Sequence, residues 1–298
     1  MACYSVELVD ERTDPLMRSV PCAYILTMHE TETFPWLHGV AARTYVQRNR
    51  GFRQCAKACG AAGSTGHVGP VDPSGPTGLS DQGPAAQIDV TYKDLTHAFQ
   101  NSFDHADRSS RSDYSHLPVL VFEDDARLAA NAKADLAEVD AFVARNDFWV
   151  YSLGSFGLMA PYDPSIRHWI FTSSVLALAH ACIYSPRARA TIRSMDACSS
   201  GHFDNGILAR FPVRLTFYRP IAYQPLRESE NSKSWCLRCD GSAADGIYRW
   251  VMRALIRALR FDTGPEAALG AVYSLQRASL IAPLLAVIVF VVLYIALC

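Results

Sequence analysis

The feature that most constrains this chain is a short apolar run that ends in three consecutive acids. The run extends from Val119 to Phe122, and Glu123, Asp124 and Asp125 follow it directly. A bounded apolar run of this length is typical of a strand that is buried on both faces of a sheet. Three neighbouring carboxylates repel one another, so they need a positive partner to stay close together. The pattern therefore predicts an α/β fold in which a buried strand delivers an acidic cluster to one edge of the sheet.

A divalent cation is the simplest partner for this acidic cluster. Mg²⁺ and Mn²⁺ prefer carboxylate oxygens and commonly share them with the phosphates of a substrate. Ligands of open α/β sheets also gather at the carboxyl ends of strands. The alternative is a solvated turn, in which Asp124 or Asp125 caps a helix predicted from Ala126 to Arg145.

The composition limits the class of protein. The chain has 298 residues, half of them hydrophobic, which is enough for one large domain or two smaller ones. Its net charge of −1 argues against a general nucleic-acid-binding protein. The nine cysteines are scattered, and no secretory signal opens the chain. We therefore expect the bulk of the protein to lie in a reducing compartment that faces the cytosol.

The sequence predicts alternating strands and helices in one domain at residues 22–227, preceded by a loose arm at residues 1–21. Ser185 is predicted to cap a helix that begins at Pro186. The predicted strands are residues 23–28, 119–122, 147–154, 169–172 or 175–179, 180–184 and 214–218. The other predicted helices are residues 36–57, 90–107, 126–145 and a helix that opens at 202–208.

Two stretches have the composition of connecting segments. Residues 60–87 are rich in Gly, Pro and Ser, which predicts a flexible loop or, alternatively, a mobile lid over a site. Residues 228–246 predict a linker. Two pairs of cysteines could bind a structural zinc ion, although free thiols are the simpler interpretation. These cysteines are Cys55, Cys59, Cys236 and Cys239.

The C-terminal end predicts a membrane anchor. Residues 280–297 form an apolar run without a charge, about long enough to cross the hydrocarbon core of a bilayer, so we predict a transmembrane helix at residues 279–298. Residues 247–261 predict a basic amphipathic helix that lies on an anionic leaflet. The positive-inside rule then places the large domain in the cytosol, as in a tail-anchored protein. The arginines that share one face of the basic helix are Arg249, Arg253, Arg257 and Arg260.

Several motifs together resemble glycosyltransferase family 25, which contains lipopolysaccharide galactosyl- and glucosyltransferases and collagen galactosyltransferases. The resemblance covers residues 24–225. Val-Phe-Glu-Asp-Asp-Ala is similar to the family's acidic motif after a strand. Further segments are similar to its next strand end, to its aromatic-bearing strand before a helix, to its later Asp and to its closing segment with Gln. These segments are residues 121–126, 153–154, 180–188, 202–204 and 222–225.

The resemblance implies a GT-A-like fold, which is a Rossmann-like mixed sheet flanked by helices, and a nucleotide-sugar donor. It also implies that Asp125 and Glu123 hold Mn²⁺ or Mg²⁺ at the donor diphosphate. Glu123, Asp124, Gly154 and Tyr184 are then the expected donor-binding residues. A strand that ends in small residues such as Gly154 also lets a ligand approach the backbone.

Asp204 is the expected catalytic residue, because a carboxylate near the acceptor can deprotonate its hydroxyl. A helix N-cap is the structural alternative for Asp204 and is compatible with this role. The cation would neutralise charge on the leaving nucleoside diphosphate. We therefore expect metal-dependent transfer of a hexose, with inversion, to a hydroxyl of a glycan, lipid or protein acceptor near a membrane.

Two other functions are consistent with the sequence. A catalytically degenerate, tail-anchored membrane scaffold is favoured by two departures from the family pattern on the donor side. Residues 27–32 differ from it, and only residues 96–98 are similar to the family's motif before the acidic run. The intact acidic triplet and Asp204 argue against a scaffold. Another metal-dependent nucleotide enzyme, such as a nucleotidyltransferase, would use the same acidic triplet. That enzyme would bind a nucleoside triphosphate in preference to a nucleotide sugar.

Overall fold

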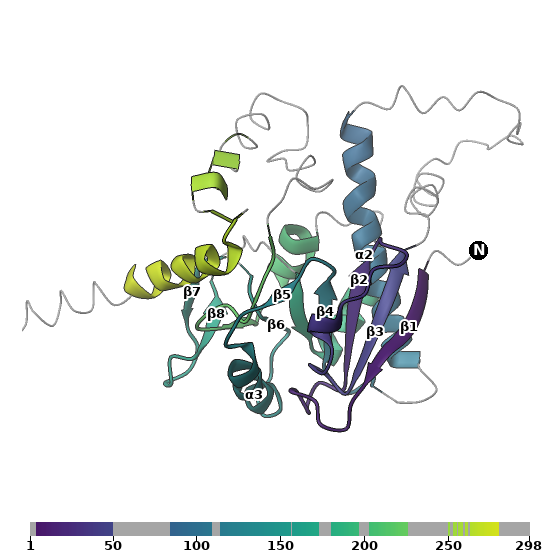
Figure 1. Cartoon of the computed structure of the whole chain (residues 1–298), viewed down its shortest axis with the longest axis horizontal. Helices are drawn as coiled ribbons and strands as arrows, with labels where there is room; N and C mark the ends of the chain where they lie inside the picture. The colour runs from purple at the N-terminus through teal and green to yellow at the C-terminus, as the bar shows by residue number, and fades with distance from the viewer. Residues whose placement is uncertain are drawn as a thin grey trace, which may run out of the picture.

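The computed structural model describes residues 4–49, 84–108, 114–155, 157–172, 180–196 and 203–225, together with 250, 253–254, 256–258, 260–261 and 263–279. Within these residues a large mixed sheet is flanked by helices, which confirms the predicted α/β class (Figure 1). The strands are β1 (Tyr4–Glu11), β2 (Cys22–Thr27), β3 (Arg43–Asn49), β4 (Val119–Glu123), β5 (Arg127–Leu128), β6 (Val150–Ser152), β7 (Met159–Pro161), β8 (His168–Phe171), β9 (Ala181–Tyr184), β10 (Arg214–Phe217) and β11 (Ala222–Tyr223).

The helices vary more in type than the sequence predicts. The α-helices are α2 (Pro84–Arg108), α3 (Ala132–Val143) and α4 (Pro186–Ser194), and a further helix occupies residues 265–279. The shorter turns are two 3-10 helices, η1 (Pro35–Leu37) and η3 (Leu208–Arg210), and a π-helix, η2 (Phe203–Ile207). Ser185 caps α4 as predicted, because its side chain accepts a hydrogen bond from the Ala188 amide at 3.3 Å.

The strand order reverses next to β2. The nine-stranded sheet has the order β1-β3-β2-β4-β9-β6-β10-β8-β7, and β11 and β5 form a separate pair. From β2 the chain moves to β3 on one side and then to β4 on the other, and both strands are parallel to β2. Strand β9 runs antiparallel between β4 and β6, while β6 and β10 are parallel. Ligands of open α/β sheets bind at such a switch point, outside the carboxyl ends of the strands.

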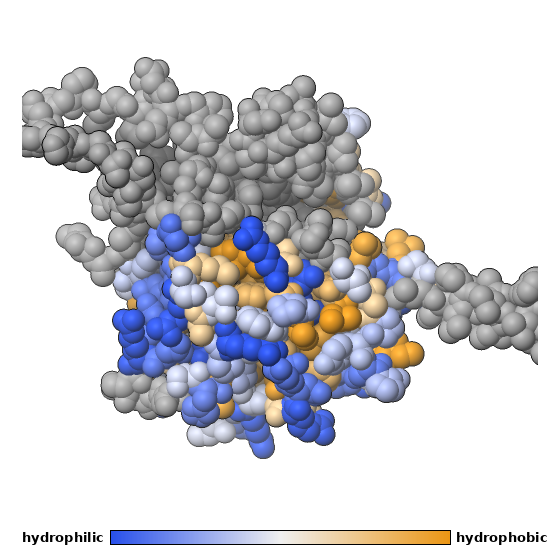
Figure 2. All heavy atoms as spheres, turned by 180° about the vertical axis from the view of Figure 1, so that it is seen from behind, coloured by the Kyte–Doolittle hydropathy of each residue, from blue (hydrophilic) through white to orange (hydrophobic). Residues whose placement is uncertain are grey.

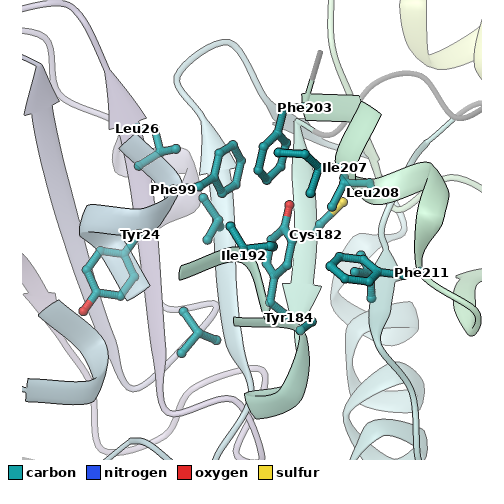
Figure 3. Close-up of a cluster of buried hydrophobic side chains, with 14 of the residues drawn as sticks. Tyr24, Leu26, Phe99, Cys182, Tyr184, Ile192, Phe203, Ile207, Leu208 and Phe211 are labelled. Atoms are coloured by element: carbon teal, nitrogen blue, oxygen red, sulfur yellow. The ribbon is translucent and has the colours of Figure 1, made fainter. Parts of the chain in front are cut away.

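Helices bury both faces of the sheet, which explains why β2 and β4 are continuous apolar runs. In β2, Tyr24 faces the cluster that contains Phe99 of α2, whereas Ile25 faces the cluster that contains Leu136 of α3. Figure 3 shows part of the first cluster, where side chains from α2, α4 and η2 pack around Tyr184 of β9. The core therefore fixes the strand ends from above and below the sheet.

Three predicted elements are wrong, and each error has the same physical cause. Residues 1–21 are not a loose arm, because Tyr4–Glu11 forms β1, an edge strand paired with β3. The helix predicted at residues 36–57 is wrong over its described part, because Arg43–Asn49 forms β3 between β1 and β2, and residues 50–57 lie outside the described residues. The predicted helix at 126–145 begins only at Ala132. In each case backbone pairing with a distant segment overrides the local preference of the sequence.

The acidic triplet does not cap the helix that follows it. Arg127–Leu128 pairs with β11 in place of the first helical turn, and Asn131 takes the N-cap position of α3. Neither Asp124 nor Asp125 therefore caps this helix. The acids lie in a turn between two strands, which leaves their side chains free of a capping role.

The helix at residues 265–279 was not predicted, and it packs on the large domain. Tyr273 is fully buried, and its hydroxyl donates to the Ser155 carbonyl at 2.7 Å and lies 3.1 Å from Thr216 Oγ1. Glu266 accepts a hydrogen bond from the Ala130 amide at 3.0 Å. The chain therefore returns to the edge of the sheet where β6 and β10 end.

Several predictions fall outside the described residues. They are the flexible loop at 60–87 apart from the start of α2, the linker at 228–246, the two cysteine pairs, and the apolar run at 280–298. The basic helix predicted at 247–261 is described only in part, with helical residues at 250, 253–254 and 256–258. Among the residues that are described, no helix is both long and apolar enough to cross a bilayer, so they lend no support to the predicted transmembrane helix.

One residue in the turn between β7 and β8 is strained. Ile166 has a φ of 57°, a left-handed conformation that a β-branched side chain rarely adopts. We expect Ile166→Asn to raise the free energy of unfolding by about 1 kcal/mol, because asparagine tolerates this conformation. Thermal unfolding of the purified chain measures the effect, with Ile166→Val as the control that keeps the strain. An unchanged or lower melting temperature for Ile166→Asn would contradict this interpretation.

Candidate active site

The carboxyl ends of β2 and β4 bring the acidic triplet next to a polar turn. The two strands pair in parallel, with Leu26 opposite Glu123. Thr27 Oγ1 donates to Asp124 Oδ2 at 2.7 Å and accepts from the His29 amide at 3.0 Å. His29 Nε2 lies 3.8 Å from the same Asp124 oxygen. Asp124 is therefore held at the switch point by groups from the neighbouring strand.

An aromatic and cationic pair flanks the triplet on its C-terminal side. Trp36 Nε1 donates to the Ala126 carbonyl at 3.0 Å, and the Arg127 guanidinium lies 4.0 Å from the centre of the Trp36 ring. Arg127 also donates to the Asp124 carbonyl at 3.2 Å. The Trp36 side chain keeps about a third of its surface exposed. Neither residue was predicted to be part of the site, because only the fold brings Trp36 beside the triplet.

Gln224 bridges the two other acids of the triplet. Its Nε2 atom donates to Asp125 Oδ2 at 2.7 Å and to Glu123 Oε2 at 3.3 Å. The residue follows β11, which is positioned by its pairing with β5 directly after the triplet. A single amide group thus lies between two carboxylates, in the kind of position that a cation favours. Gln224 was recognised only as part of a motif and was not predicted to contact the acids.

Gly154 supports the segment that carries Gln224. A Cβ atom on Gly154 would lie only 1.9 Å from the Ala222 carbonyl oxygen, so no larger residue fits there. The amides of Ile221 and Ala222 both donate to the Leu153 carbonyl, at 2.7 and 2.9 Å. The close approach at Gly154 is therefore made by the chain itself. Contact of Gly154 with a donor stays a prediction.

Burial and repulsion raise the pKa values of the two bridged acids. Burial raises the pKa of Glu123 well above its usual range, and repulsion from Asp125, Asp204 and Asp124 adds to this effect. Burial also raises the pKa of Asp125 to about 6, against the opposing hydrogen bond from Gln224. Among the described residues, Asp125 Oδ1 is buried without a hydrogen-bond partner. The pair therefore has negative charge and acceptor capacity that the described side chains do not satisfy.

This electrostatic strain predicts how stability depends on pH. The folded-state pKa of Asp125, about 6, exceeds its ordinary value of 3.8, so the folded protein binds more protons in this range. Its contribution to stability is complete below pH 3.8 and is lost as the pH rises through about 6. We expect the melting temperature in EDTA to be lower at pH 7.5 than at pH 5. The corresponding loss in the free energy of unfolding is on the order of 1–2 kcal/mol. Differential scanning fluorimetry measures the change.

The Asp125→Asn variant is the control for this pH dependence. The variant removes the titrating group, so its melting temperature is expected to change less between pH 5 and pH 7.5. An equal pH slope in the wild-type and variant proteins would assign the effect to other groups.

Asp204 lies in the first turn of η2, which is packed against the core. The neighbouring Phe203 ring stacks on Phe99 of α2, with centroids 3.8 Å apart and an angle of 9° between the rings (Figure 3). Asp204 is close enough to raise the pKa values of Glu123 and Cys182 by its charge. The structure therefore brings Asp204 into the electrostatic neighbourhood of the triplet. Single turns of π-helix are frequent at functional sites.

Tyr184 packs its ring in the core, while its hydroxyl end lies close to the acids. Burial raises the pKa of Tyr184 well above its usual range, and the charges of Cys182, Asp204 and Glu123 add to this effect. Contact of Tyr184 with a donor stays a prediction. The Tyr184 side chain is fully buried, and its ring packs against Phe99, Phe103 and Phe203 at centroid distances of 5.6, 5.1 and 6.5 Å. Its backbone pairs with Val119, at the end of β4 opposite Glu123. Figure 3 shows the Tyr184 ring below Phe203, so Tyr184 supports η2 from within the core.

The acids fit a cation that is shared with a substrate. Within the part of the chain that the structure describes, no three His, Cys, Asp or Glu side chains are grouped as a metal centre. Mg²⁺ sites commonly use one or two carboxylates and complete the coordination with substrate phosphates and water. The unpaired oxygen of Asp125 and the neighbouring Glu123 carboxylate suit this kind of site.

Comparison of the sequence with known protein families finds no matching family, and comparison with curated proteins finds no matching protein. The resemblance to glycosyltransferase family 25 therefore stays a prediction from the motifs.

Proposed function

We propose that this protein is a metal-dependent glycosyltransferase, which moves a hexose from a nucleotide-sugar donor to a hydroxyl of a glycan, lipid or protein acceptor. The observation that carries the proposal is the pair Glu123 and Asp125, bridged by Gln224 at the carboxyl end of β4 beside the switch point. The parallel strands β3, β2, β4, β6 and β10, with β9 reversed among them, support a GT-A-like fold.

The residues of the triplet have separate roles in this proposal. Asp125 and Glu123 would hold Mn²⁺ or Mg²⁺, which supplies positive charge against the diphosphate of the leaving group. Thr27 and His29 position Asp124 on the β2 side, where the nucleotide would bind. Arg127 lies over Trp36, and this pair offers an aromatic surface and a positive charge to the nucleotide.

Asp204 would act as the general base. The acceptor oxygen forms a bond to the anomeric carbon, the bond from that carbon to the diphosphate oxygen breaks, and the acceptor proton passes to Asp204. Attack from the face opposite the leaving group inverts the anomeric configuration. The packing of Phe203 on Phe99 would hold Asp204 in place during this step.

The membrane association is a further part of the proposal. The uncharged run at residues 280–297 has about the length of a bilayer span, and Arg277 precedes it. We place this run in a membrane and the large domain on its cytosolic side, in accordance with the positive-inside rule. An acceptor at the membrane surface would then be within reach.

A thermal-shift screen of the full chain in detergent tests the proposed activity. The ligands are UDP-, GDP- and CMP-sugars and nucleoside triphosphates, each with and without Mn²⁺. We expect stabilisation that requires both Mn²⁺ and one nucleotide sugar. Stabilisation by a triphosphate in preference to any nucleotide sugar would favour a nucleotidyltransferase.

A catalytically degenerate membrane scaffold is the second candidate, and one observation favours it. The Gln224 amide already lies between Glu123 and Asp125, where a cation would otherwise neutralise their charge. In a scaffold this arrangement would be permanent, and neither Mn²⁺ nor any nucleotide sugar would stabilise the folded protein. In an enzyme, the Gln224 side chain would move when the cation binds.

A further inference from the structure

The end of the sheet that carries β7 and β8 exposes large hydrophobic side chains. Leu158 precedes β7, and Tyr162 and Ile166 lie in the turn between β7 and β8, with exposed fractions of 65%, 42% and 56%. Leu275, on the helix at 265–279, is 67% exposed. We call these four residues the β7–β8 surface. Figure 2 shows hydrophobic residues gathered on the right of the view. This side corresponds to the left of Figure 1, where β7 and β8 lie, because the view is turned by 180°.

Contacts join the helix at 265–279 to the turn between β7 and β8. The Arg277 guanidinium lies 5.4 Å from the centre of the Tyr218 ring, and the Tyr218 amide donates to the Arg167 carbonyl at 2.8 Å. Arg167 directly follows Ile166. The end of the helix and the β7–β8 turn are therefore linked through Tyr218, and the Arg167 side chain pairs with Glu138 of α3.

The conformation of Ile166 gives an independent reason to assign this surface a partner. Its left-handed backbone would favour glycine or asparagine, and its side chain lies more than half outside the fold. The turn itself is held by other groups, since Trp169 Nε1 donates to the Ile166 carbonyl at 2.8 Å and the Ile166 amide donates to the Asp163 carbonyl at 3.1 Å. Neither turn geometry nor core packing accounts for an isoleucine here.

The position of the surface along the chain identifies the partner. Tyr273 fixes the helix to the ends of β6 and β10, and the helix is described up to residue 279. The uncharged run begins at residue 280 in the sequence. Leu275 lies four residues before Ser279, about 6 Å along the helix axis. A hydrophobic surface close to the start of a membrane anchor has the chemistry of a bilayer contact.

We propose that the β7–β8 surface lies against the lipid bilayer and inserts Leu158, Tyr162 and Ile166 among the lipid headgroups. This inference rests on the membrane anchor proposed above and does not depend on the transferase chemistry. The contact fixes the orientation of the domain, because the helix at 265–279 is held by Tyr273 at the sheet edge that also bears the acidic triplet. The acceptor hydroxyl would then lie in the headgroup layer.

Site-specific photocrosslinking of the full chain tests this contact. Ile166 is replaced by p-benzoylphenylalanine, and the protein is reconstituted in vesicles of phosphatidylcholine and phosphatidylglycerol. The matched control carries the same residue at Leu8, which is 38% exposed on β1, at the opposite edge of the sheet from β7. After irradiation, mass spectrometry measures the fraction of protein that carries a lipid adduct. We expect at least five times more adduct at position 166 than at position 8.

Three results would overturn the proposal. They are equal adduct at the two positions, a crosslink from position 166 to the protein's own residues 280–298, and failure of the chain to associate with the vesicles. The thermal shift with nucleotide sugar and Mn²⁺ is measured on the same variants. A retained shift without lipid adduct would reject the bilayer contact alone, whereas adduct without any shift would reject the transferase alone.

Discussion

Replacing Asp125 with asparagine is expected to lower the rate of nucleoside diphosphate release from the donor by about 10²–10³-fold, because the amide cannot supply the charge that holds a divalent cation. The fold is expected to survive the change. Burial raises the pKa of Asp125 to about 6, so its charged form is unfavourable in the metal-free protein at neutral pH. The variant should therefore unfold at the same temperature as the metal-free wild-type protein, or at a higher one.

The matched control for this variant is Asp14→Asn. Asp14 is an exposed acid that pairs with Arg18 on the surface, so its replacement changes the net charge equally and leaves the triplet intact. Turnover is measured with the donor that the thermal-shift screen identifies, over a range of Mn²⁺ concentrations. Metal-dependent turnover within a factor of three of the wild-type rate in Asp125→Asn would remove this residue from the proposed metal site.

Replacing Asp204 with asparagine is expected to lower kcat by about 10²–10⁴-fold while donor binding is retained, which is the range for loss of a general base. The asparagine side chain could still occupy the first turn of η2, and the stacking of Phe203 on Phe99 should keep that turn in place. The variant also removes one negative charge near Glu123. Both proposed metal ligands stay in place, however, so the affinity for Mn²⁺ is expected to fall less than in Asp125→Asn.

The separation of binding from turnover distinguishes the two acids. For Asp204→Asn, the thermal shift with donor and Mn²⁺ should persist while product release falls. Asp147→Asn is the control, since Asp147 is an exposed acid before β6 that pairs with Arg187. A loss of donor binding in proportion to the loss of turnover would show that Asp204 binds the donor or supports the fold, and that it is not the base.

The buried strands could be predicted from the sequence because their local pattern and their environment agree. The run before Glu123 is buried on both faces between α2 and α3, so its apolar residues need no alternation. The α4 boundary is similarly local, since Ser185 and Pro186 are adjacent in sequence and act within one turn. Strand β10 is also buried along its whole length, which made it recognisable.

The elements that were missed depend on contacts across long sequence separations. Strand β3 carries polar and basic residues that favoured a helix, yet its backbone pairs with β2 on one side and β1 on the other. Arg127 and Leu128 take a strand conformation because β11, which is distant in the sequence, pairs with them. The helix at 265–279 is placed by Tyr273, which is buried against Ser155 and Thr216, and both of these residues are distant in the sequence.

In the candidate site, too, local sequence patterns could be predicted and long-range contacts could not. The triplet was recognisable because three acids after an apolar strand are unusual in a buried setting. The contact of Gln224 with Glu123 and Asp125, and the position of Trp36 beside Arg127, were not recognisable. Tyr184 was predicted to bind the donor because its segment resembles the aromatic-bearing strand of the family. The packing of its ring in the core cluster around η2 could not be predicted.

A titration of Mn²⁺ followed by electron paramagnetic resonance is the most direct test of the central claim, because the signal of free Mn²⁺ falls when the protein binds it. We expect wild-type protein to bind one Mn²⁺ more tightly when the nucleotide sugar from the screen is present. Asp125→Asn should bind at least ten times more weakly, and Asp14→Asn should bind as the wild-type protein does. Equal binding by the wild-type protein and Asp125→Asn, or no binding by either with the donor present, would contradict a metal-dependent site at the end of β4.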